Sequence, residues 1–488
     1  MTVRCLVTGA TGYIGGRLAP RLVSDGFDVR VVSRDPARLR DAPWRNDVEV
    51  AQADVSDGAA LRTAMQDVDV AFYLVHSMHG GRDFADRDRV AAQMFGQAAR
   101  EAGVRRIVYL GGLLPASGEL SPHLQSRAEV GEILLDSGVP TAVLQAAAIL
   151  GSGSASFEML RYLTERLPVM VTPKWVRSQL QPIAIRDVLH YLRASVDLPP
   201  DVHRAFDIGG PDVVTYAELM HRYAAVAGLH RRILLPVPAL TPRLSSHWVN
   251  LVTPVPAAIA KPLVESLRHE MVCREDDIRR WVPDPEAGLV GVDEALRLAL
   301  ARVRDAHVET RWSSASWPGA ASDPMPTDPS WSGGSMYVDE RSTHVDADGP
   351  TLWNVIEGIG GENGWYSFPL AWSVRGWMDR LVGGVGLRRG RRDPRRLLVG
   401  ETLDWWRVEE VDRGRLLRLR AEMRVPGTAW LELRVDGDGA DVVYRQRAVF
   451  VPRGLAGHLY WWAVAPFHRF VFGGMGRNIA AAAARATG

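Results

Sequence analysis

The sequence has few cysteines and no long hydrophobic run, and each shortage excludes a class of protein. Its 488 residues contain two cysteines, Cys5 and Cys273, which cannot form a disulfide framework. No uncharged apolar run reaches the roughly 18 residues of a transmembrane helix, and the N-terminus lacks the layout of a signal peptide. We therefore expect a cytoplasmic protein without an integral membrane segment, although a peripheral membrane contact stays open.

A strong charge of either sign is also lacking, since 58 basic residues face 57 acidic residues. Before His307 there are 35 basic and 36 acidic residues, and from it onward there are 23 and 21. Neither half has the basic excess of a duplex-binding module, so we expect no nucleic-acid partner. The run from Arg388 to Arg396 is a local exception with six arginines. It is either a solvated loop or a contact for an anionic ligand or acidic lipid.

Tryptophan is scarce in the first part of the chain and frequent in the second. Four of the 16 tryptophans precede His307 and 12 lie from it onward, which indicates two domains of different kind. Residues 313–335 include 14 Ser, Pro or Gly, a composition typical of a linker. We expect one domain over residues 1–306, with its substrate-side part over 150–306, and a second domain over 336–488.

Short apolar runs alternate with helical patterns along the first 145 residues. Continuous apolar strands that alternate with helices are typical of a parallel sheet covered on both faces. The expected fold class is therefore α/β, a doubly wound parallel sheet of Rossmann type. The expected strands are Val3–Thr8, Val29–Ser33, Val48–Ala53, Val70–Val75, Arg106–Gly111 and Thr141–Gln145, and the expected helices are Gly15–Ser24, Arg87–Ala102 and Ser121–Asp136.

The period of the apolar residues changes after the linker. Apolar and polar residues alternate over 417–425, 431–435 and 442–450, with turn residues between these runs. This pattern predicts an antiparallel meander, and hence an α+β domain. Helices are expected at Pro350–Gly360, Trp372–Val382 and Leu455–Ala484, the last with a start or kink at Pro466.

A glycine-rich loop follows the first expected strand and opens the first expected helix. It reads Thr8-Gly9-Ala10-Thr11-Gly12-Tyr13-Ile14-Gly15. Glycines let the backbone approach a pyrophosphate, and the helix N-terminus offers N–H donors to it. We expect the residues from Gly9 to Gly15 to bind a dinucleotide cofactor.

The end of the second strand discriminates between NADP(H) and NAD(H). An acidic residue at this place favours NAD(H), because it binds the ribose 2′-hydroxyl. This chain has Ser33 and Arg34 there, and a hydroxyl with a guanidinium suits a 2′-phosphate. Asp35 follows and keeps NAD(H) possible, but NADP(H) is the expected cofactor.

These segments resemble the short-chain dehydrogenase/reductase superfamily, in particular its extended and atypical branches, which are NmrA-like and epimerase-like. The resemblance rests on the loop, on Ser33-Arg34 and on Asp54-Val55 after the third strand, and it covers about residues 1–304. It implies that Asp54 and Val55 lie near the adenine. The resemblance further implies cofactor contacts from Leu74, Val75, His76 and Gly111, and substrate-side elements at Ile183–Val188 and Phe206–Pro211.

The catalytic position departs from the pattern of that superfamily. Its members have Tyr-x-x-x-Lys on the helix after strand five, where Tyr delivers a proton and Lys holds the nicotinamide ribose. The corresponding helix here carries His123-Leu124-Gln125-Ser126-Arg127. His123 is a candidate acid because histidine titrates near neutral pH, and Arg127 is a candidate for the ribose hydroxyls. The alternative for His123 is a helix-surface residue without chemistry. No metal site is expected.

The second domain resembles the helix-grip fold of START-like and polyketide-cyclase-like proteins. The segments RVPGTAWLELRV and LYWWAVAPFHRF, joined to an atypical reductase, also resemble a bacterial two-domain family whose second half is a domain of unknown function. The helix-grip resemblance implies an apolar cavity between a sheet and the long helix. Nine tryptophans would line this cavity or fill a small core: Trp353, Trp365, Trp372, Trp377, Trp405, Trp406, Trp430, Trp461 and Trp462.

The sequence therefore favours an NADP(H)-binding oxidoreductase of atypical type that acts on a hydrophobic small molecule with a carbonyl or quinone group. One alternative is a nucleotide-binding sensor or scaffold without turnover, since the usual Tyr and Lys are missing. The other is a lipid or polyketide binder whose reductase-like half is regulatory. Neither the substrate nor the oligomeric state is readable from the sequence.

Overall fold

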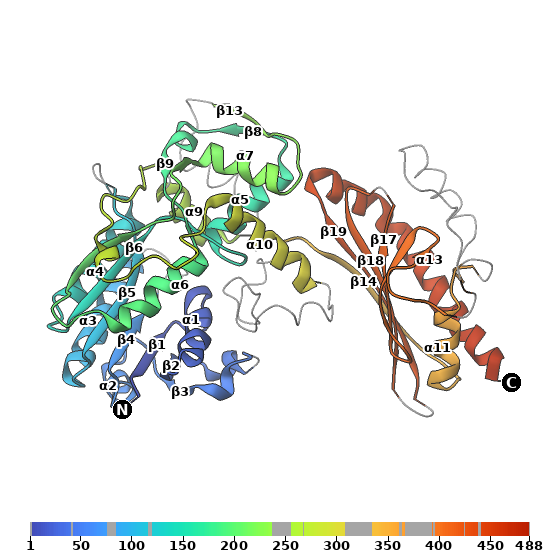
Figure 1. Ribbon diagram of the computed structural model, residues 1–488, viewed down its shortest axis with the longest axis horizontal. Helices are drawn as coiled ribbons and strands as arrows, with labels where there is room; N and C mark the ends of the chain where they lie inside the picture. The colour runs from blue at the N-terminus through green and yellow to red at the C-terminus, as the bar shows by residue number, and fades with distance from the viewer. Residues whose placement is uncertain are drawn as a thin grey trace. The chain divides into compact units, whose positions relative to one another are not determined.

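The computed structural model divides the chain into two compact units, Met1–Gly334 and Ser335–Gly488 (Figure 1). The structure describes residues 2–40, 42–75, 84–115, 120–236, 255–266, 268–307, 334–360, 364–366, 393, 396–423, 425–437 and 441–487. Each unit has its own sheet and its own buried core.

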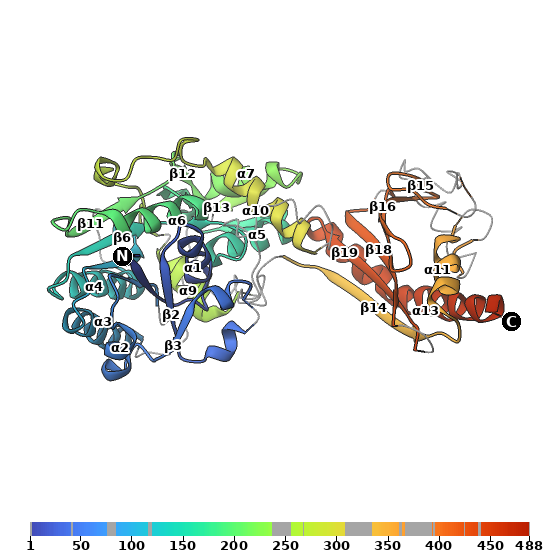
Figure 2. The same cartoon turned by 60° about the horizontal axis from the view of Figure 1, so that its bottom comes forward.

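The first unit is built on a seven-stranded sheet whose neighbouring strands are all parallel. Its order is β11-β6-β5-β4-β1-β2-β3, and β1, β2 and β3 lie side by side (Figure 2). The strands are β1 Arg4–Thr8, β2 Asp28–Ser33, β3 Glu49–Gln52, β4 Val70–Tyr73, β5 Arg106–Gly112, β6 Thr141–Ala146 and β11 Arg204–Ile208. The predicted parallel sheet is confirmed, and the expected substrate-side segment Phe206–Pro211 supplies most of its seventh strand.

Different helices cover the two faces of this sheet. One face packs on α1 (Tyr13–Ser24) and α6 (Ile185–Ala194), and the other packs on α2 (Gly58–Ala64), α3 (Phe84–Glu101) and α4 (Pro122–Leu135). Strand β4 shows why a continuous apolar run forms here. Val70 and Phe72 pack on one side, Ala71 and Tyr73 pack on the other, and all four are at most 2% exposed. Each such large side chain stabilises the fold by about 2–3 kcal/mol when it leaves water.

The rest of the first unit surrounds a second core beside the sheet. Its elements are β7 Ile149–Leu150, α5 Ala155–Arg166, β8 Val169–Thr172, η3 Lys174–Arg177, β9 Gln179–Leu180, β10 Ile183–Ala184, η4 Ser195–Asp197, β12 Val214–Thr215, α7 Tyr216–Val226, β13 Ile233–Pro236, α9 Ala257–Ser266, η5 Asp277–Arg280 and α10 Val292–His307. Side-chain caps fix two of these helices: Ser154 Oγ accepts from Phe157 N, and Thr215 Oγ1 accepts from Glu218 N.

The second unit holds a six-stranded antiparallel sheet of order β14-β19-β18-β17-β16-β15. The strands are β14 Tyr337–His344, β15 Thr402–Leu403, β16 Trp406–Asp412, β17 Leu416–Ala421, β18 Gly427–Asp436 and β19 Val443–Pro452. Leu417, Leu419, Leu431 and Leu433 lie in the same core as residues of α11 (Gly349–Glu357) and α13 (Gly454–Thr487). The predicted antiparallel sheet is confirmed, whereas likeness to the START-like fold stays a prediction. The helix expected at Trp372–Val382 lies outside the described residues.

The described tryptophans of the second unit are buried, with one exception among those expected at a cavity. Six are at most 8% exposed: Trp353, Trp365, Trp405, Trp406, Trp430 and Trp461. Three indole N–H groups donate to carboxylates, those of Trp353 to Glu357, Trp365 to Asp404 and Trp430 to Glu409, at 2.7–2.9 Å. Trp462 is 64% exposed, so its expected place at an internal cavity is wrong. Trp372 and Trp377 lie outside the described residues.

Candidate functional site

The glycine-rich loop joins the end of β1 to the start of α1, as the motif requires. Gly9 has a φ of 69°, a conformation that favours glycine, and its carbonyl accepts a hydrogen bond from Gly12 N at 2.9 Å. Gly12 occupies the N-cap position of α1, and its carbonyl accepts from Gly16 N at 3.0 Å. The turn is therefore tight, and it leads directly into the N-terminus of α1, where helical N–H groups can bind an anion.

Side chains would not fit at two positions of this loop. A Cβ on Gly9 would lie 2.6 Å from Leu74 O, and a Cβ on Gly15 would lie 2.4 Å from Gly9 O. The loop backbone thus lies directly against the end of β4 and against the first turn of α1. This bare backbone surface at a helix N-terminus fits the pyrophosphate of a dinucleotide.

Thr8 connects the end of β1 to the end of β4. Its hydroxyl donates to Phe72 O at 2.9 Å and accepts from Leu74 N at 3.0 Å. The sheet order changes direction between these two strands, and ligands of doubly wound sheets bind at such a switch point. Leu74 and Val75 are half-buried there. His76 lies outside the described residues.

Two charged residues follow the end of β2. Arg34 is exposed, whereas Asp35 is engaged in a helix cap. Arg34 Nη1 lies 3.9 Å from Asp54 Oδ2. Asp35 caps the short helix η1 (Pro36–Leu39), because its carboxylate accepts from Ala37 N at 3.1 Å. Ser33 Oγ donates to Asp35 O at 2.9 Å. The exposed guanidinium suits a ribose 2′-phosphate better than the capping carboxylate suits a 2′-hydroxyl.

Asp54 and Val55 follow β3, where the resemblance expects the adenine. Asp54 Oδ1 accepts from Ser56 Oγ at 2.7 Å and from Ser56 N at 2.9 Å. The hydroxyl hydrogen bond from Ser56 is the main reason why the pKa of Asp54 lies below its usual value. The carboxylate therefore stays ionised and fixed in place, and Val55 beside it is half-buried.

Strand β5 and helix α4 hold the candidate catalytic residues. The Arg127 guanidinium donates to Leu110 O and lies 5.0 Å from the centre of the Tyr109 ring. Tyr109 Oη donates to Arg127 O at 3.2 Å, and burial raises the pKa of Tyr109 to about 12, so this phenol stays neutral. Gly111 is buried at the end of β5. Arg127 is thus held against the strand that ends at the expected nicotinamide position.

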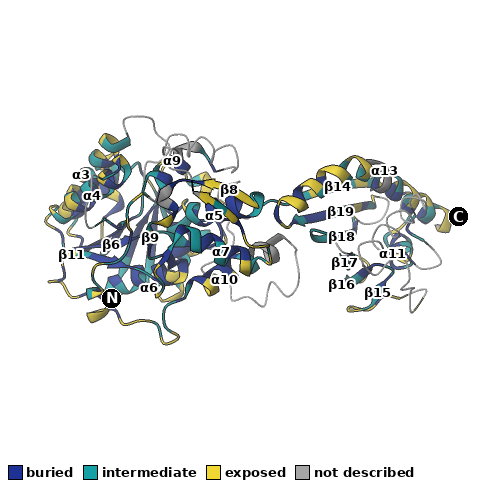
Figure 3. Cartoon of the chain, turned by 90° about the horizontal axis from the view of Figure 1, so that it is seen from above, coloured by how far each residue is buried: buried dark blue, intermediate teal, exposed yellow. Residues whose placement is uncertain are grey.

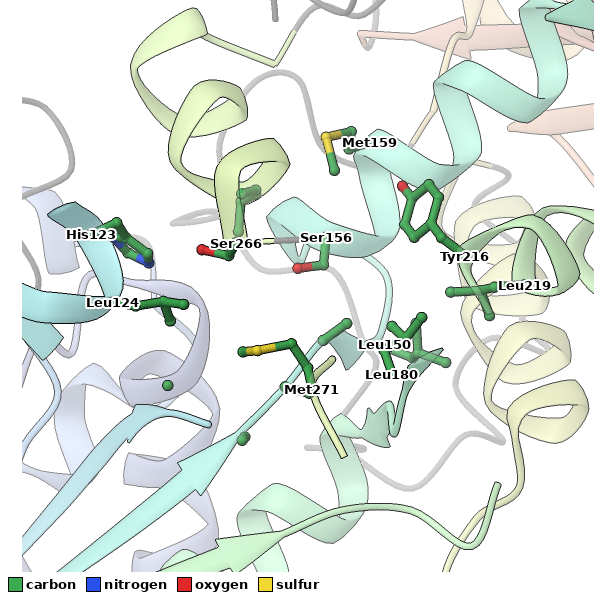
Figure 4. Close-up of a pocket in the computed structure, with 15 residues that line it drawn as sticks. His123, Leu124, Leu150, Ser156, Met159, Leu180, Tyr216, Leu219, Ser266 and Met271 are labelled. Atoms are coloured by element: carbon green, nitrogen blue, oxygen red, sulfur yellow. The ribbon is translucent and has the colours of Figure 1, made fainter. Parts of the chain in front are cut away.

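His123 lies one helical turn before Arg127 and faces a pocket of about 90 Å³. The pocket lies beside the carboxyl ends of β5 and β6. Its lining consists of Gly112, His123, Leu124, Ala146, Ala147, Ala148, Leu150, Ser156, Met159, Leu180, Tyr216, Leu219, Leu263, Ser266 and Met271. Figure 4 shows His123 and Leu124 on one side of the pocket and Tyr216 and Leu219 on the opposite side. The structure therefore brings His123 to a cavity.

The pocket lining is mostly apolar and contains no Asp, Glu, Lys or Arg side chain. Its polar side chains are His123, Ser156, Tyr216 and Ser266. Burial raises the pKa of Tyr216 far above its usual value, so its phenol stays neutral. Such a lining fits an uncharged molecule with one or two hydrogen-bonding groups.

Three of these polar residues were missed by the sequence reasoning. Ser156 lies on α5, Tyr216 on α7 and Ser266 on α9, far apart in the chain. No motif marks them, because only the tertiary fold brings the three helices together. Among the described residues, no group of three or more His, Cys, Asp or Glu could hold a metal ion. No helix in the same part of the chain is long and apolar enough to cross a membrane.

Two family models match separate parts of the chain. Residues 9–149 match a family described as NAD(P)H-binding, and residues 331–475 match one described as a protein of unknown function, DUF2867. The two matches fall on the two structural units.

Two curated relatives match about half of the chain. The (4-alkanoyl-5-oxo-2,5-dihydrofuran-3-yl)methyl phosphate reductase of Streptomyces griseus is 30% identical over 230 residues, which are 46% of this chain and 73% of that protein. The ceramide reductase of Caulobacter vibrioides is 29% identical over 279 residues, 54% of this chain and 83% of that protein. Among solved structures, the triphenylmethane reductase of Citrobacter sp. complexed with NADP(H) aligns with a TM-score of 0.49 and 20% identity, over 61% of this chain and 99% of that chain.

Proposed function

The chain belongs, through its first unit, to the NAD(P)H-binding reductases of the short-chain dehydrogenase/reductase type, and we propose that it uses NADP(H) to reduce the carbonyl or quinone group of an uncharged hydrophobic molecule. The observation that carries this proposal is the position of His123. Its side chain lines an apolar pocket together with Gly112 and Ala146–Ala148, beside the carboxyl ends of β5 and β6. A cofactor that follows the loop at Gly9–Gly15 across the sheet would reach this edge.

We assign the cofactor to the loop, to Arg34, and to the residues at the ends of β3 and β4. The loop N–H groups would bind the pyrophosphate, Arg34 the 2′-phosphate, and Asp54 and Val55 the adenine side. Bound NADPH would supply the hydride. The protein residues have the remaining tasks, which are orientation, exclusion of water and proton delivery.

His123 is the proposed proton donor, and Arg127 is a proposed positioning residue. A protonated imidazole can donate to the carbonyl oxygen of a substrate in the pocket, while the apolar lining keeps water away. Arg127 is held by Leu110 O and by the Tyr109 ring, so its guanidinium has a defined position from which it would contact the nicotinamide ribose. This His-x-x-x-Arg pair has the spacing of the Tyr-x-x-x-Lys pair of the superfamily.

The neutral lining also favours one substrate class over another. The Streptomyces relative is named for a phosphate ester, and such a substrate would require cationic partners. The pocket lining of this chain includes no lysine or arginine. We therefore propose an uncharged substrate and expect phosphate esters to be poor ones.

The test is a panel of uncharged ketones and quinones with NADPH, applied to the wild type and to His123→Gln. We expect the variant to lose about 100-fold or more in kcat, with an unchanged Kd for NADPH. The wild-type rate of reduction should fall as pH rises through the titration of histidine, and the variant should lack that dependence. Gln125→Ala on the exposed side of α4 is the matched control. Turnover by His123→Gln at the wild-type rate would refute the assigned role.

A nucleotide-binding sensor without turnover is the second candidate. The observation that favours it is the engagement of Arg127 with Leu110 O and Tyr109, which leaves its guanidinium fewer free N–H donors for a ribose. This candidate predicts tight NADPH binding and no NADPH oxidation with any member of the panel. NADPH oxidation that is abolished in His123→Gln would exclude it.

A further inference from the structure

Helix α13 carries an apolar face that lies away from the sheet of the second unit. Its large side chains are Leu455, Leu459, Trp462 and Phe467, which are 40%, 55%, 64% and 66% exposed. Ala456, Ala463 and Pro466 are exposed beside them. These seven residues form what we call the α13 face, and the exposed stretches along the helix are visible in Figure 3.

The spacing of the residues makes this a continuous surface rather than scattered side chains. Leu455, Leu459 and Trp462 are separated by four and three residues, so they lie in one stripe along the helix. Phe467 lies five residues after Trp462, about 140° around the helix, and the exposed Ala463 and Pro466 lie between these two directions. The large contiguous apolar patches of monomeric proteins are often interaction sites.

Trp461, the residue before Trp462, shows how α13 is rotated about its own axis. Trp461 is 8% exposed, and its ring stacks between Tyr337 and Phe450, with ring centres 5.0 and 5.8 Å away. Successive helical residues differ by about 100° in direction. Trp462 therefore cannot enter the core while Trp461 remains there, so its exposure is built into the fold.

The charge of α13 indicates what could cover this face. Its 34 residues include three arginines, Arg469, Arg477 and Arg485, and no Asp, Glu or Lys. Arg453, which is exposed, stands directly before the helix. The apolar face is therefore preceded by one arginine and followed by another. A helix face of Trp, Phe and Leu bordered by arginines is typical of segments that lie in the interface of an anionic membrane.

We propose that the α13 face docks on the surface of a membrane that contains anionic phospholipids. Leu459, Trp462 and Phe467 enter the boundary between headgroups and acyl chains. Arg453 and Arg477, which are both exposed, contact lipid phosphates. Contact with a second copy of the chain fits less well. A symmetric pair of α13 helices would bring arginines together without an acidic residue on either helix to pair with them.

Co-sedimentation of the full chain with vesicles tests this proposal. We expect binding to phosphatidylcholine vesicles that contain phosphatidylglycerol, weaker binding to phosphatidylcholine alone, and a decrease with added salt. The double variant Trp462→Ser/Phe467→Ser should lower the partition coefficient roughly tenfold or more. The matched control is Leu398→Ser/Val399→Ser, which removes two apolar side chains of the same unit that are 53% and 61% exposed. The control should bind as the wild type does.

Three results would overturn the proposal. The first is a wild type that stays in the supernatant with anionic vesicles. The second is a Trp462→Ser/Phe467→Ser variant that sediments as the wild type does. The third is a wild type that is dimeric in solution and that the same double variant turns into a monomer, because the face would then join two copies. Circular dichroism of all variants checks that these surface changes leave the fold intact.

Discussion

The central strands of the two sheets bury different kinds of side chain. In the first unit, strand β4 is apolar and fully buried, and the distinctive polar groups lie at the carboxyl ends of the strands. In the second unit, the side chains of Arg418 and Glu432 are 0% and 1% exposed, while Trp462 on the surface is 64% exposed. Polar groups at the strand ends are typical of a sheet that binds a small molecule at its edge, whereas the second sheet places an ion pair in its interior.

Four charged residues form a row across the sheet of the second unit, and the middle two, Arg418 and Glu432, are buried. Glu410, Arg418, Glu432 and Arg447 are cross-strand partners on β16, β17, β18 and β19, with charges that alternate in sign. Arg418 Nε lies 3.0 Å from Glu432 Oε1, and Arg447 Nη1 lies 3.5 Å from Glu432 Oε2. Charges can be buried in this way only because each has a partner.

The largest expected effect comes from breaking this row. Arg418→Met leaves Glu432 buried without its main partner, and we expect a loss of about 3–5 kcal/mol in the unfolding free energy of the second unit. Chemical denaturation followed by tryptophan fluorescence measures it. The matched control is Arg445→Met, whose side chain is 46% exposed and should contribute less than about 1 kcal/mol. Equal losses of unfolding free energy in both variants would show that the buried ion pair stabilises the unit no more than an exposed one does.

The next effect concerns the glycine loop of the first unit. Gly9→Ala would place a Cβ 2.6 Å from Leu74 O, so we expect NADPH affinity to fall roughly 100-fold, or about 2.7 kcal/mol. Gly26 has a similar positive φ of 86°, and no atom lies within 4 Å of a Cβ there. Gly26→Ala therefore carries the same backbone strain without the collision. Isothermal titration of NADPH into both variants should show a loss only for Gly9→Ala.

A smaller effect is expected for the choice of nucleotide. Arg34→Ala should weaken NADPH binding roughly 10- to 100-fold and leave NADH binding nearly unchanged, because only the 2′-phosphate contact is removed. Arg21→Ala is the control, since Arg21 is an exposed arginine with an acidic neighbour, Asp25. Tighter binding of NADH than of NADPH by the wild type would contradict the assignment.

The smallest effect is a pH dependence at the start of α11. Asp348 caps this helix, and the hydrogen bond from the Thr351 side chain holds the pKa of the carboxyl below its usual value. A carboxyl with a lowered pKa stabilises the fold above its unfolded-state pKa, and this contribution is lost as pH falls through the folded-state pKa. Asp348→Asn should therefore be slightly less stable at neutral pH and equal to the wild type at low pH. A difference that is constant with pH would disprove this role.

Local patterns predicted much of the first unit. The strands and the glycine loop were readable because apolar runs and glycines at fixed spacing reflect contacts within a few residues. Helix α2 was missed, since its seven residues include only one large apolar side chain. The place of Phe206–Ile208 in β11 could not be predicted either. This strand pairs with β6, and many of the residues between the two strands belong to the second core.

The candidate site was predicted only in part. His123 could be proposed from its place after strand five, but its pocket depends on α5, α7 and α9, whose contacts are long-range. The orientation of α13 likewise depends on long-range contacts that the sequence pattern does not reveal. Its sequence is apolar on nearly all sides, so the direction of Trp461 and Trp462 could not be read from periodicity. The stacking of Trp461 on Tyr337 and Phe450 and the burial of Phe472, Met475 and Ile479 in the core determine which side is exposed.

The proposed chemistry is tested most directly by a structure of the full chain with NADP⁺ bound. The proposed function requires the pyrophosphate at Gly9–Gly15, the 2′-phosphate at Arg34, and the nicotinamide ring beside Gly112 with His123 facing the same pocket. A nicotinamide ring that lies away from this pocket, with His123 out of reach of any substrate at its C4 atom, would contradict the proposed reduction.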